Sequence, residues 1–371
     1  MKDKIIFISS SMKPLQNFLL EQIKSLSYEY DIILISNIND YDINIFKNFQ
    51  IKHIPISRYI NIYYDFISLI IIFKNLLKFK PKLIISITPK AGFILSVSNF
   101  FLKNKHLHFI TGQNWINKKG SKRFFFKLLD KFTFYNATSM LVDSNSQINF
   151  LKSENFNTDH MKLINSGSIC GVNTKIFIPN SQYKNKKRKK LQITKYEIVI
   201  LYLGRMHKDK GIFELYEVCR KLFNEGFQLK LFLVGSIEDP KFNKIINKNR
   251  SFIYHFDYNN FPQKFLQIAD IFCIPSFREG FGLSVIEASA CELPVIGTNI
   301  NGLKDSIVDN HTGILFNFGD SFDFYSKLKK LIIDKKFRLY LGKNGRKRVI
   351  SDFNKKDVVK FIDLHIRKII N

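Results

Sequence analysis

The chain has 371 residues, of which 45% are apolar and 24% are charged. This composition excludes a disordered chain and is sufficient for two domains with sizeable cores. The net charge is +27, and roughly two thirds of that excess lies before residue 190. Such an excess indicates an anionic partner of the first half (a membrane surface, a phosphorylated substrate or nucleic acid) or a genome bias toward lysine.

The cysteines and the apolar runs bear on where the protein works. The four cysteines lie far apart without a C-x-x-C pair, so neither a zinc site nor a disulfide framework is indicated, and a reducing cytosol fits. The early apolar run Ile5–Ile8 is too short for a signal peptide. The longest apolar stretches, Phe66–Phe73 and Ala91–Leu102, are shorter than the about 18–20 residues of a membrane-spanning helix. We therefore expect a cytoplasmic protein that does not cross a membrane.

The first half of the chain alternates short apolar runs with periodic segments of helix length. The predicted strands are Ile5–Ser9, Asp31–Ser36, Lys82–Ile87, His106–Ile110 and Ser139–Val142. The predicted helices between them are Leu15–Leu26, Tyr64–Phe79, Ala91–Leu102 and Ser121–Tyr135. This alternation is typical of a parallel sheet that is covered by helices on both faces.

The same pattern starts again after residue 195. The predicted strands are Glu197–Leu203, Gln228–Val234, Ile253–Tyr254, Ile271–Pro275 and Pro294–Gly297. The predicted helices are Gly211–Glu225, Phe261–Ile268, Gly282–Ala290, Ser321–Ile333 and Phe337–Phe353. A final segment, Lys355–Ile370, has apolar residues at roughly helical spacing, so we expect it to pack on a domain.

The sequence therefore predicts an α/β fold of two Rossmann-like, doubly wound domains that face a cleft. The N-terminal domain spans residues 1–178, a basic linker 179–195, the C-terminal domain 196–353, and a helix that packs back on the N-terminal domain 354–371. The linker contains the cationic run Lys186–Lys190, which is interpreted as a solvated loop because adjacent cations repel one another in a packed element. A nuclear-import or nucleic-acid patch is the alternative.

One motif follows the strand predicted over Ile271–Pro275. A turn with Glu279 and Gly280 comes next, and a helix begins near Gly282. The glycines let a ligand approach the backbone, and the start of the helix offers free N–H groups to a phosphate. Glu279 can accept hydrogen bonds from sugar hydroxyls, and Glu287 suits a ribose diol if it faces the cleft. An ordinary surface carboxylate is the alternative for Glu287.

A second motif, Leu203–Ile212, follows the first strand of the second domain and opens a helix. Its Arg205 and Lys210 can neutralise a pyrophosphate and stabilise it as a leaving group. His207 and Lys208 are expected to face solvent. A solvated basic loop is the alternative for the whole motif.

These segments resemble the retaining glycosyltransferases of family 4 (glycosyl transferases group 1), which have two Rossmann-like domains in the GT-B arrangement. The resemblance rests on Glu279 and Glu287, which form an E-x7-E pair, and on the G-R-x-x-x-x-K-G loop that starts at Gly204. It also rests on the segments that follow Glu287 as far as Phe316. It implies that Arg205, Lys210 and Glu279 carry the chemistry. It also implies a set of donor-binding residues: Gly204, Gly280, Phe281, Gly282, Leu283, Ser284 and Glu287.

The N-terminal half resembles bacterial capsule and O-antigen sugar transferases of this family in the segments Ser86–Gly92 and Phe109–Trp115. Gln113 stands in a loop where many relatives have a histidine, and Asn173 stands where aspartate is more usual. Lys90 and Gln113 are the candidates for contact with the acceptor.

Two further segments bear on a membrane and on a metal. Trp115–Phe134 interleaves aromatic residues with six cations, which suits the headgroup region of an anionic bilayer, or else a core-packed helix with a basic outer face. Asp40 and Asp42 form a D-x-D, the metal motif of a different glycosyltransferase fold, but they lie in a polar loop far from the donor motifs. The histidines lack ligand spacing, so we expect no metal and no cofactor.

The resemblance implies a retaining transferase of the hexosyltransferase type that moves a sugar from a nucleoside-diphosphate sugar, with UDP favoured, to a lipid-linked saccharide such as a polyprenyl-diphosphate sugar. The N-terminal domain would bind the acceptor, the C-terminal domain the donor, and the product would be surface polysaccharide (O-antigen, capsule or lipopolysaccharide) made at the inner face of the plasma membrane. The alternatives are a sugar-nucleotide epimerase on the same scaffold and a nucleic-acid-binding protein, which the absence of a recognition motif disfavours.

Overall fold

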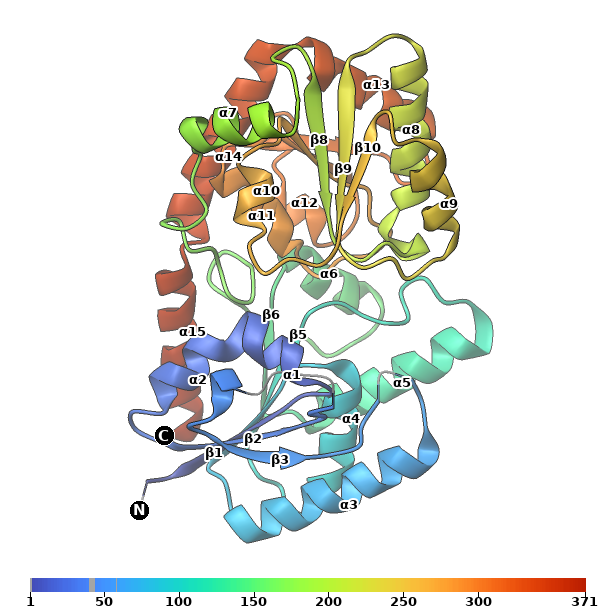
Figure 1. The fold of residues 1–371 in the computed structure, drawn as a ribbon. Helices are drawn as coiled ribbons and strands as arrows, with labels where there is room; N and C mark the ends of the chain where they lie inside the picture. Colours follow the sequence, from blue (N-terminus) through green and yellow to red (C-terminus); the bar gives the residue numbers. More distant parts are fainter. Residues whose placement is uncertain (1, 40–43, 58) are drawn as a thin grey trace. The chain divides into compact units, whose positions relative to one another are not determined.

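A computed structural model describes residues 2–39, 44–57 and 59–371 of the chain. The chain forms two compact α/β units, the first from Met1–Cys170 with Lys356–Asn371 and the second from Gly171–Lys355 (Figure 1). Each unit is Rossmann-like, because each contains a parallel sheet whose strands are joined by helices. The chain passes from the first unit to the second at residue 170, so the segment 171–195 belongs to the second unit.

The sheet of the first unit has the strand order β3-β2-β1-β4-β5-β6-β7, and its neighbouring strands pair in parallel. Its strands are β1 (Lys4–Ile8), β2 (Asp31–Ser36), β3 (Gln50–His53), β4 (Leu83–Ser86), β5 (His106–Ile110), β6 (Ser139–Val142) and β7 (Met161–Leu163). The order changes direction between β1 and β4, and this is the position at which open α/β sheets bind ligands.

The helices of the first unit cover the two faces of this sheet (Figure 1). They are α1 (Met12–Pro14), η1 (Leu15–Leu19), α2 (Leu20–Leu26), η2 (Asn44–Phe46), α3 (Ile62–Phe79), α4 (Pro89–Ser98), α5 (Gly120–Asn136), α6 (Asn145–Ser153) and α15 (Lys355–Ile370). The last helix, α15, returns to this unit, where Lys105 Nζ donates to the carbonyl of Ile369 at 2.6 Å and Ser25 donates to Asp363 at 2.5 Å. No helix in the described part of the chain is long and apolar enough to span a membrane.

The sheet of the second unit has the order β10-β9-β8-β11-β12-β13 and is also parallel. Its strands are β8 (Ile198–Leu203), β9 (Leu229–Val234), β10 (Ile253–Phe256), β11 (Ile271–Ile274), β12 (Val295–Thr298) and β13 (Gly313–Phe316). Its helices are α7 (Ser181–Lys190), η3 (Lys208–Lys210), α8 (Ile212–Asn224), α9 (Lys241–Lys248), α10 (Gln263–Leu266), α11 (Leu283–Ala290), α12 (Leu303–Ser306), α13 (Ser321–Ile333) and α14 (Lys335–Asp352).

Alternating residues of the second sheet enter two separate cores. Ile200 and Tyr202 of β8 pack with α8, α9 and α13, whereas Val199 and Leu201 pack with α10, α11 and α12. Since successive side chains of a strand point to opposite faces, a strand with a core on each face is apolar throughout. This accounts for the unbroken apolar sequence of β8.

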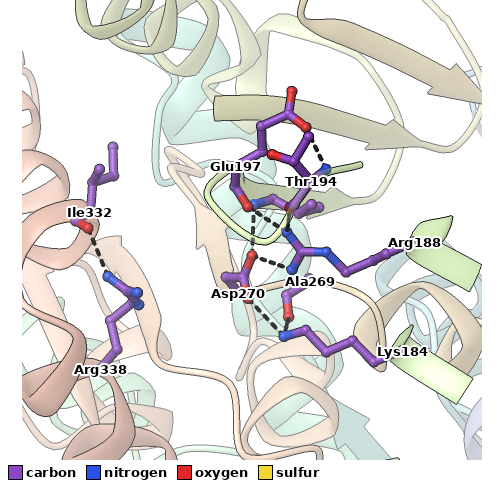
Figure 2. Close-up of polar contacts among 9 residues, drawn as sticks. Lys184, Arg188, Thr194, Glu197, Ala269, Asp270, Ile332 and Arg338 are labelled. Atoms are coloured by element: carbon purple, nitrogen blue, oxygen red, sulfur yellow. Dashed lines mark hydrogen bonds and ion pairs between the residues drawn. The ribbon is translucent and has the colours of Figure 1, made fainter. Parts of the chain in front are cut away.

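The segment predicted as an exposed basic linker is instead helical over Ser181–Lys190 in α7, so this prediction is wrong. Asn180 caps the helix by accepting the N–H of Tyr183 at 2.9 Å. Lys184 and Arg188 lie one helical turn apart, and both contact Asp270, at 2.7 and 2.9 Å (Figure 2). The repulsion within the run is offset because Arg188 shares the carboxylate of Asp270 with Lys184, while Lys186, Lys189 and Lys190 remain exposed.

Asp270 joins α7 to two strands of the sheet. Its carboxylate also accepts the N–H of Val199 at 2.8 Å, and Arg188 donates to the carbonyls of Thr194 and Glu197 (Figure 2). Burial alone would raise the pKa of Asp270, but the adjacent Lys184 and Arg188 reverse the effect, and the pKa lies below its ordinary value. The carboxylate is therefore charged and fully bonded in the folded protein.

Candidate donor site

The loops that follow β8, β9, β11 and β12 lie at one edge of the second sheet, because the carboxyl ends of parallel strands meet there. The chain runs outward from β8 through β9 to β10, and then from β11 through β12 to β13. The direction therefore changes between β8 and β11, where a crevice for a ligand is expected in an open α/β sheet. Both motifs singled out in the sequence follow these two central strands.

Glycines bring the neighbouring loops into backbone contact. Gly211 has a φ of +64°, and a Cβ there would lie 1.9 Å from the carbonyl oxygen of Pro275. Gly302 has a φ of +87°, and a Cβ there would lie 2.2 Å from the carbonyl oxygen of Gly280. The N–H of Phe277 also donates to the carbonyl of Asp209 at 2.9 Å. Any larger residue at either glycine would separate the loops, so both the backbone conformation and the packing require glycine.

Lys210 and Glu279 meet at the point between β8 and β11. The Nζ of Lys210 lies 2.7 Å from Glu279 Oε1, and both side chains are less than one fifth exposed. The structure thus brings together two residues that are 69 positions apart in the sequence and that were predicted as members of one site. The ammonium group of Lys210 is therefore held by the carboxylate of Glu279.

Arg205 has a carboxylate partner that the sequence reasoning missed. Its Nη1 lies 2.5 Å from Glu238 Oε2, in the loop after β9, and the N–H of Glu238 donates to the carbonyl of Met206 at 3.1 Å. Burial alone would lower the pKa of Arg205, but the hydrogen bond and charge of Glu238 raise it. The rule that strand ends converge at one edge could have indicated Glu238, since it follows β9 closely.

The other side chains of the loop after β8 differ in their surroundings. His207 was expected to face solvent, yet it is half-buried, with Nδ1 2.6 Å from Asp209 Oδ1. Arg278 approaches the other oxygen of Asp209 at 3.8 Å. Lys208 is exposed, as expected. The loop therefore contributes Arg205 and Lys210 to the carboxyl edge, while Lys208 remains in solvent.

Helix α11 begins at this edge, with Gly282 at its N-cap position and a φ of +80°. Leu283 and Ser284 form its first turn and are half-buried, so their N–H groups are positioned at the start of the helix. Phe281, predicted as a donor-binding residue, is buried and packs edge-on against Phe353 with 5.2 Å between the ring centroids. Its side chain therefore packs in the core of the unit and is not exposed to a ligand.

Glu287 lies further along α11 and is half-buried. Burial raises the pKa of Glu287 to about 8, against the opposing charge of Lys355. At neutral pH this carboxyl group is therefore mostly protonated, and it can donate a hydrogen bond as well as accept one. Such a group can bind a hydroxyl in either direction.

The acceptor-side candidates in the first unit are both engaged by neighbouring side chains. Lys90, in the first turn of α4, lies 2.7 Å from Asp65 and donates to the carbonyl of Tyr59 at 2.5 Å. Gln113, after β5, is buried and donates to Gln147 Oε1 at 3.2 Å. Gln147 in turn donates to Asp143 at 2.5 Å, a link that no spacing in the sequence indicated.

The loops at the direction change of the first sheet also touch. The N–H of Ser10, after β1, donates to Thr88 Oγ1, after β4, at 3.1 Å. Among the residues that the structure describes, no group of three or more His, Cys, Asp or Glu side chains could hold a metal ion. Asp40 and Asp42 of the D-x-D lie outside the described residues.

Comparisons with known proteins agree on one family. Residues 183–348 match the family model of the glycosyl transferases group 1. The capsular polysaccharide biosynthesis glycosyltransferase CapM of Staphylococcus aureus is 32% identical over 314 residues, which is 82% of each chain. The UDP-Gal:α-D-GlcNAc-diphosphoundecaprenol α-1,3-galactosyltransferase of Escherichia coli is 25% identical and covers 85% of this chain and 83% of its own.

A solved structure supports the same fold. Anabaena HepE, determined in complex with UDP and glucose, superposes with a TM-score of 0.83 over 98% of this chain and 99% of its own, at 14% sequence identity. At that identity the likeness establishes the arrangement of strands and helices only.

Proposed function

This chain belongs to the glycosyl transferases group 1 family, and from that premise we propose that it transfers a sugar from a nucleoside-diphosphate sugar to a lipid-linked saccharide, with retention at the anomeric carbon. The chain is a glycosyltransferase, and its relative CapM is named for the biosynthesis of capsular polysaccharide.

The observation that carries the proposal is the pair of cations beside the start of α11. Arg205 and Lys210 follow β8, and the first N–H groups of α11 follow β11, at the two strands between which the sheet changes direction. Each cation is paired with a carboxylate, Arg205 with Glu238 and Lys210 with Glu279. A diphosphate offers both cations stronger and more numerous acceptors, because charged oxygen atoms bind N–H donors at helix starts and on cationic side chains.

The chemistry follows from where charge develops. The bond between the anomeric carbon and the diphosphate oxygen breaks, so negative charge grows on the diphosphate while the sugar becomes oxocarbenium-like. Arg205, Lys210 and the N–H groups near Gly282–Ser284 would stabilise the departing diphosphate. The acceptor hydroxyl then forms its bond on the same face, and its proton passes to the departing diphosphate. No protein nucleophile is needed.

The two glutamates take different parts in this proposal. Once the diphosphate binds Lys210, Glu279 is released to accept hydrogen bonds from the transferred sugar. Glu287, held largely protonated by burial, would bind the ribose hydroxyls of the nucleotide. A UDP-sugar is favoured because the Escherichia coli relative is named for UDP-Gal. The two cations supply the charge that a divalent metal would otherwise provide, so no metal is proposed.

The acceptor is proposed to be a polyprenyl-diphosphate saccharide, since that relative is named for a diphosphoundecaprenol acceptor. The protein would meet it as a peripheral protein at the inner face of the plasma membrane, with the first unit on the acceptor side. The four cysteines are buried as thiols, which suits a reducing compartment. The net charge of +27 suits an anionic surface rather than a neutral one.

The experiment is acceptor-dependent release of nucleoside diphosphate. A panel of UDP- and GDP-sugars is first ranked by thermal stabilisation, because a ligand at 100 times its Kd stabilises by about 2.7 kcal/mol. The best donor is then incubated with and without a polyprenyl-diphosphate saccharide. We expect UDP release, with an elongated lipid product, only when both are present. Conversion of the donor sugar without acceptor would instead indicate an epimerase and would contradict the proposal.

A further inference from the structure

Tyr202, near the end of β8, is a buried tyrosine whose hydroxyl group has its partner in the candidate donor site. The side chain is 1% exposed, and it belongs to the core cluster that contains Met206 and Ile212. Its hydroxyl donates to the carbonyl of Arg205 at 2.9 Å. A phenylalanine would fill the same space in the core, so this hydrogen bond is what a tyrosine adds at the position.

The hydroxyl of Tyr202 reaches this carbonyl because the residue at the turn after β8 is glycine. A Cβ at Gly204 would lie 2.6 Å from Tyr202 Oη and 3.0 Å from Cζ. Any larger residue would therefore displace either the tyrosine ring or the turn. Gly204, predicted as a donor-binding residue, thus also gives the hydroxyl access to the main chain of the loop.

The main chain on both sides of the Arg205 carbonyl is held by hydrogen bonds. The N–H of Met206 donates to the carbonyl of Ser236 at 2.8 Å, which ties the turn to the loop after β9. The carbonyl of Arg205 accepts the N–H of His207 at 3.0 Å as well as the hydroxyl of Tyr202. Tyr202 therefore supplies a contact from the core of the unit to a turn that is otherwise held by neighbouring loop backbone.

The hydroxyl of Tyr202 is also within range of the charges of the site. Burial raises the pKa of Tyr202 well above its ordinary value, and the charge of Glu279 raises it further. The charge of Arg205 opposes this, while those of Asp209 and Glu238 add to it. Tyr202 therefore remains protonated at any working pH, so its hydroxyl stays a hydrogen-bond donor to the carbonyl.

Arg205 has to change partners when a donor binds. Its guanidinium lies 2.5 Å from Glu238, and in the proposed function it moves to the diphosphate. A long side chain loses rotamer freedom on binding, and a main chain that had to be ordered at the same time would add to this cost. A main chain that is already fixed confines the change to the side chain.

We propose that Tyr202 is a positioning residue of the donor site, whose hydroxyl holds the main chain of Arg205 while the guanidinium leaves Glu238 for the diphosphate. Tyr202 acts through Arg205 and not on the donor, because its own side chain is buried. Without the hydroxyl the turn would adopt further conformations, and the apparent affinity falls with the fraction of molecules that present Arg205 correctly. The inference rests on the proposed function, in which Arg205 binds the diphosphate.

Titration of UDP into Tyr202→Phe measures the contribution of the hydroxyl, since this variant keeps the ring. We expect UDP to bind about fivefold more weakly than to wild type, the effect of one neutral hydrogen bond. The matched control is Tyr325→Phe, which removes a hydroxyl that donates to Glu225 at 2.7 Å, and it should bind UDP as wild type does. Wild-type affinity in Tyr202→Phe would overturn the proposal.

A double-mutant cycle shows whether the hydroxyl acts through Arg205. In an Arg205→Ala background, Tyr202→Phe should change UDP affinity by less than about twofold, because no guanidinium is left to position. A merely structural role in the core would weaken binding equally in both backgrounds. An equal loss in the two backgrounds would therefore contradict positioning.

Hydrogen exchange of the chain without nucleotide measures the loop itself. The amides of Met206 and His207 should exchange about fivefold faster in Tyr202→Phe than in wild type or Tyr325→Phe, because the turn opens more often. Exchange at the wild-type rate would overturn the proposal. Failure of the proposed function has a different signature: Arg205→Ala would bind UDP as wild type does while the loop amides still respond to Tyr202→Phe, and a role of Tyr202 in donor binding would then be refuted with it.

Discussion

Replacing Asp270 by asparagine removes the charge that fixes α7 to the second sheet. The carboxylate accepts from Lys184 at 2.7 Å, Arg188 at 2.9 Å and the N–H of Val199 at 2.8 Å. Breaking a buried ion pair by removing one partner costs about 3–5 kcal/mol. The Lys184 side chain is 29% exposed and can turn to water, whereas Arg188 is 11% exposed, so we expect the lower end, about 3 kcal/mol.

Hydrogen exchange of the α7 amides measures this effect locally. A loss of about 3 kcal/mol corresponds to exchange about 100-fold faster, because 1.4 kcal/mol is a factor of ten. The matched control is Glu217→Gln, whose pair with Arg220 is exposed to solvent and therefore contributes little to stability. If the α7 amides of Asp270→Asn exchange as slowly as those of wild type, the carboxylate does not hold the helix and the reasoning fails.

The ion pairs of Asp270 with Lys184 and Arg188 also make the stability of the fold depend on pH. The folded-state pKa of Asp270 is depressed, so its stabilising effect is complete above the unfolded pKa of about 3.9 and is lost as the pH falls through the folded value. Urea unfolding monitored by circular dichroism should therefore show a smaller difference between wild type and Asp270→Asn at low pH than at pH 7. If the difference in the free energy of unfolding between wild type and Asp270→Asn is as large below pH 4 as it is at pH 7, the assignment is contradicted.

Two further outcomes follow from the donor site. Glu238→Gln should tighten UDP binding severalfold in a calorimetric titration, because Arg205 would then not have to break an ion pair before it binds the diphosphate. Weaker binding would mean that Glu238 positions Arg205 instead. Transfer activity should survive excess EDTA, because Arg205 and Lys210 neutralise the leaving group, and abolition with rescue by Mn²⁺ would direct attention back to Asp40 and Asp42.

The central strands could be predicted from the sequence because they are apolar along their length. Asp31–Ser36, His106–Ile110 and Ser139–Val142 have the predicted bounds, and the five strands predicted in the second unit differ from β8 to β12 by one or two residues at their ends, whereas β13 was not predicted. The edge strands of the first sheet were missed for the opposite reason. β3 and β7 are short and carry polar residues such as Gln50 and Lys162, so no apolar run marks them.

Contacts between side chains that are far apart in the sequence were the part of the site that was hardest to predict. Arg205, Lys210 and Glu279 could be assigned together because each follows the end of a central strand, and such ends converge. Neither Glu238 nor Gln147 belongs to a motif: the position of Glu238 just after β9 was its one signal in the sequence, and nothing in the sequence indicated Gln147. Helix α7 was missed because the charge run was judged by its own repulsion, without the distant Asp270.

Titration of UDP into the wild-type chain and three single variants tests the central claim most directly. Arg205→Ala and Lys210→Ala should each weaken binding by about 1.5–3 kcal/mol, or about 10- to 150-fold, because each removes a charged donor from the diphosphate. Lys208→Ala, the exposed lysine of the same loop, should bind as wild type does. If the affinity of both site variants equals that of wild type and of Lys208→Ala, the diphosphate binds elsewhere and the account of the site is contradicted.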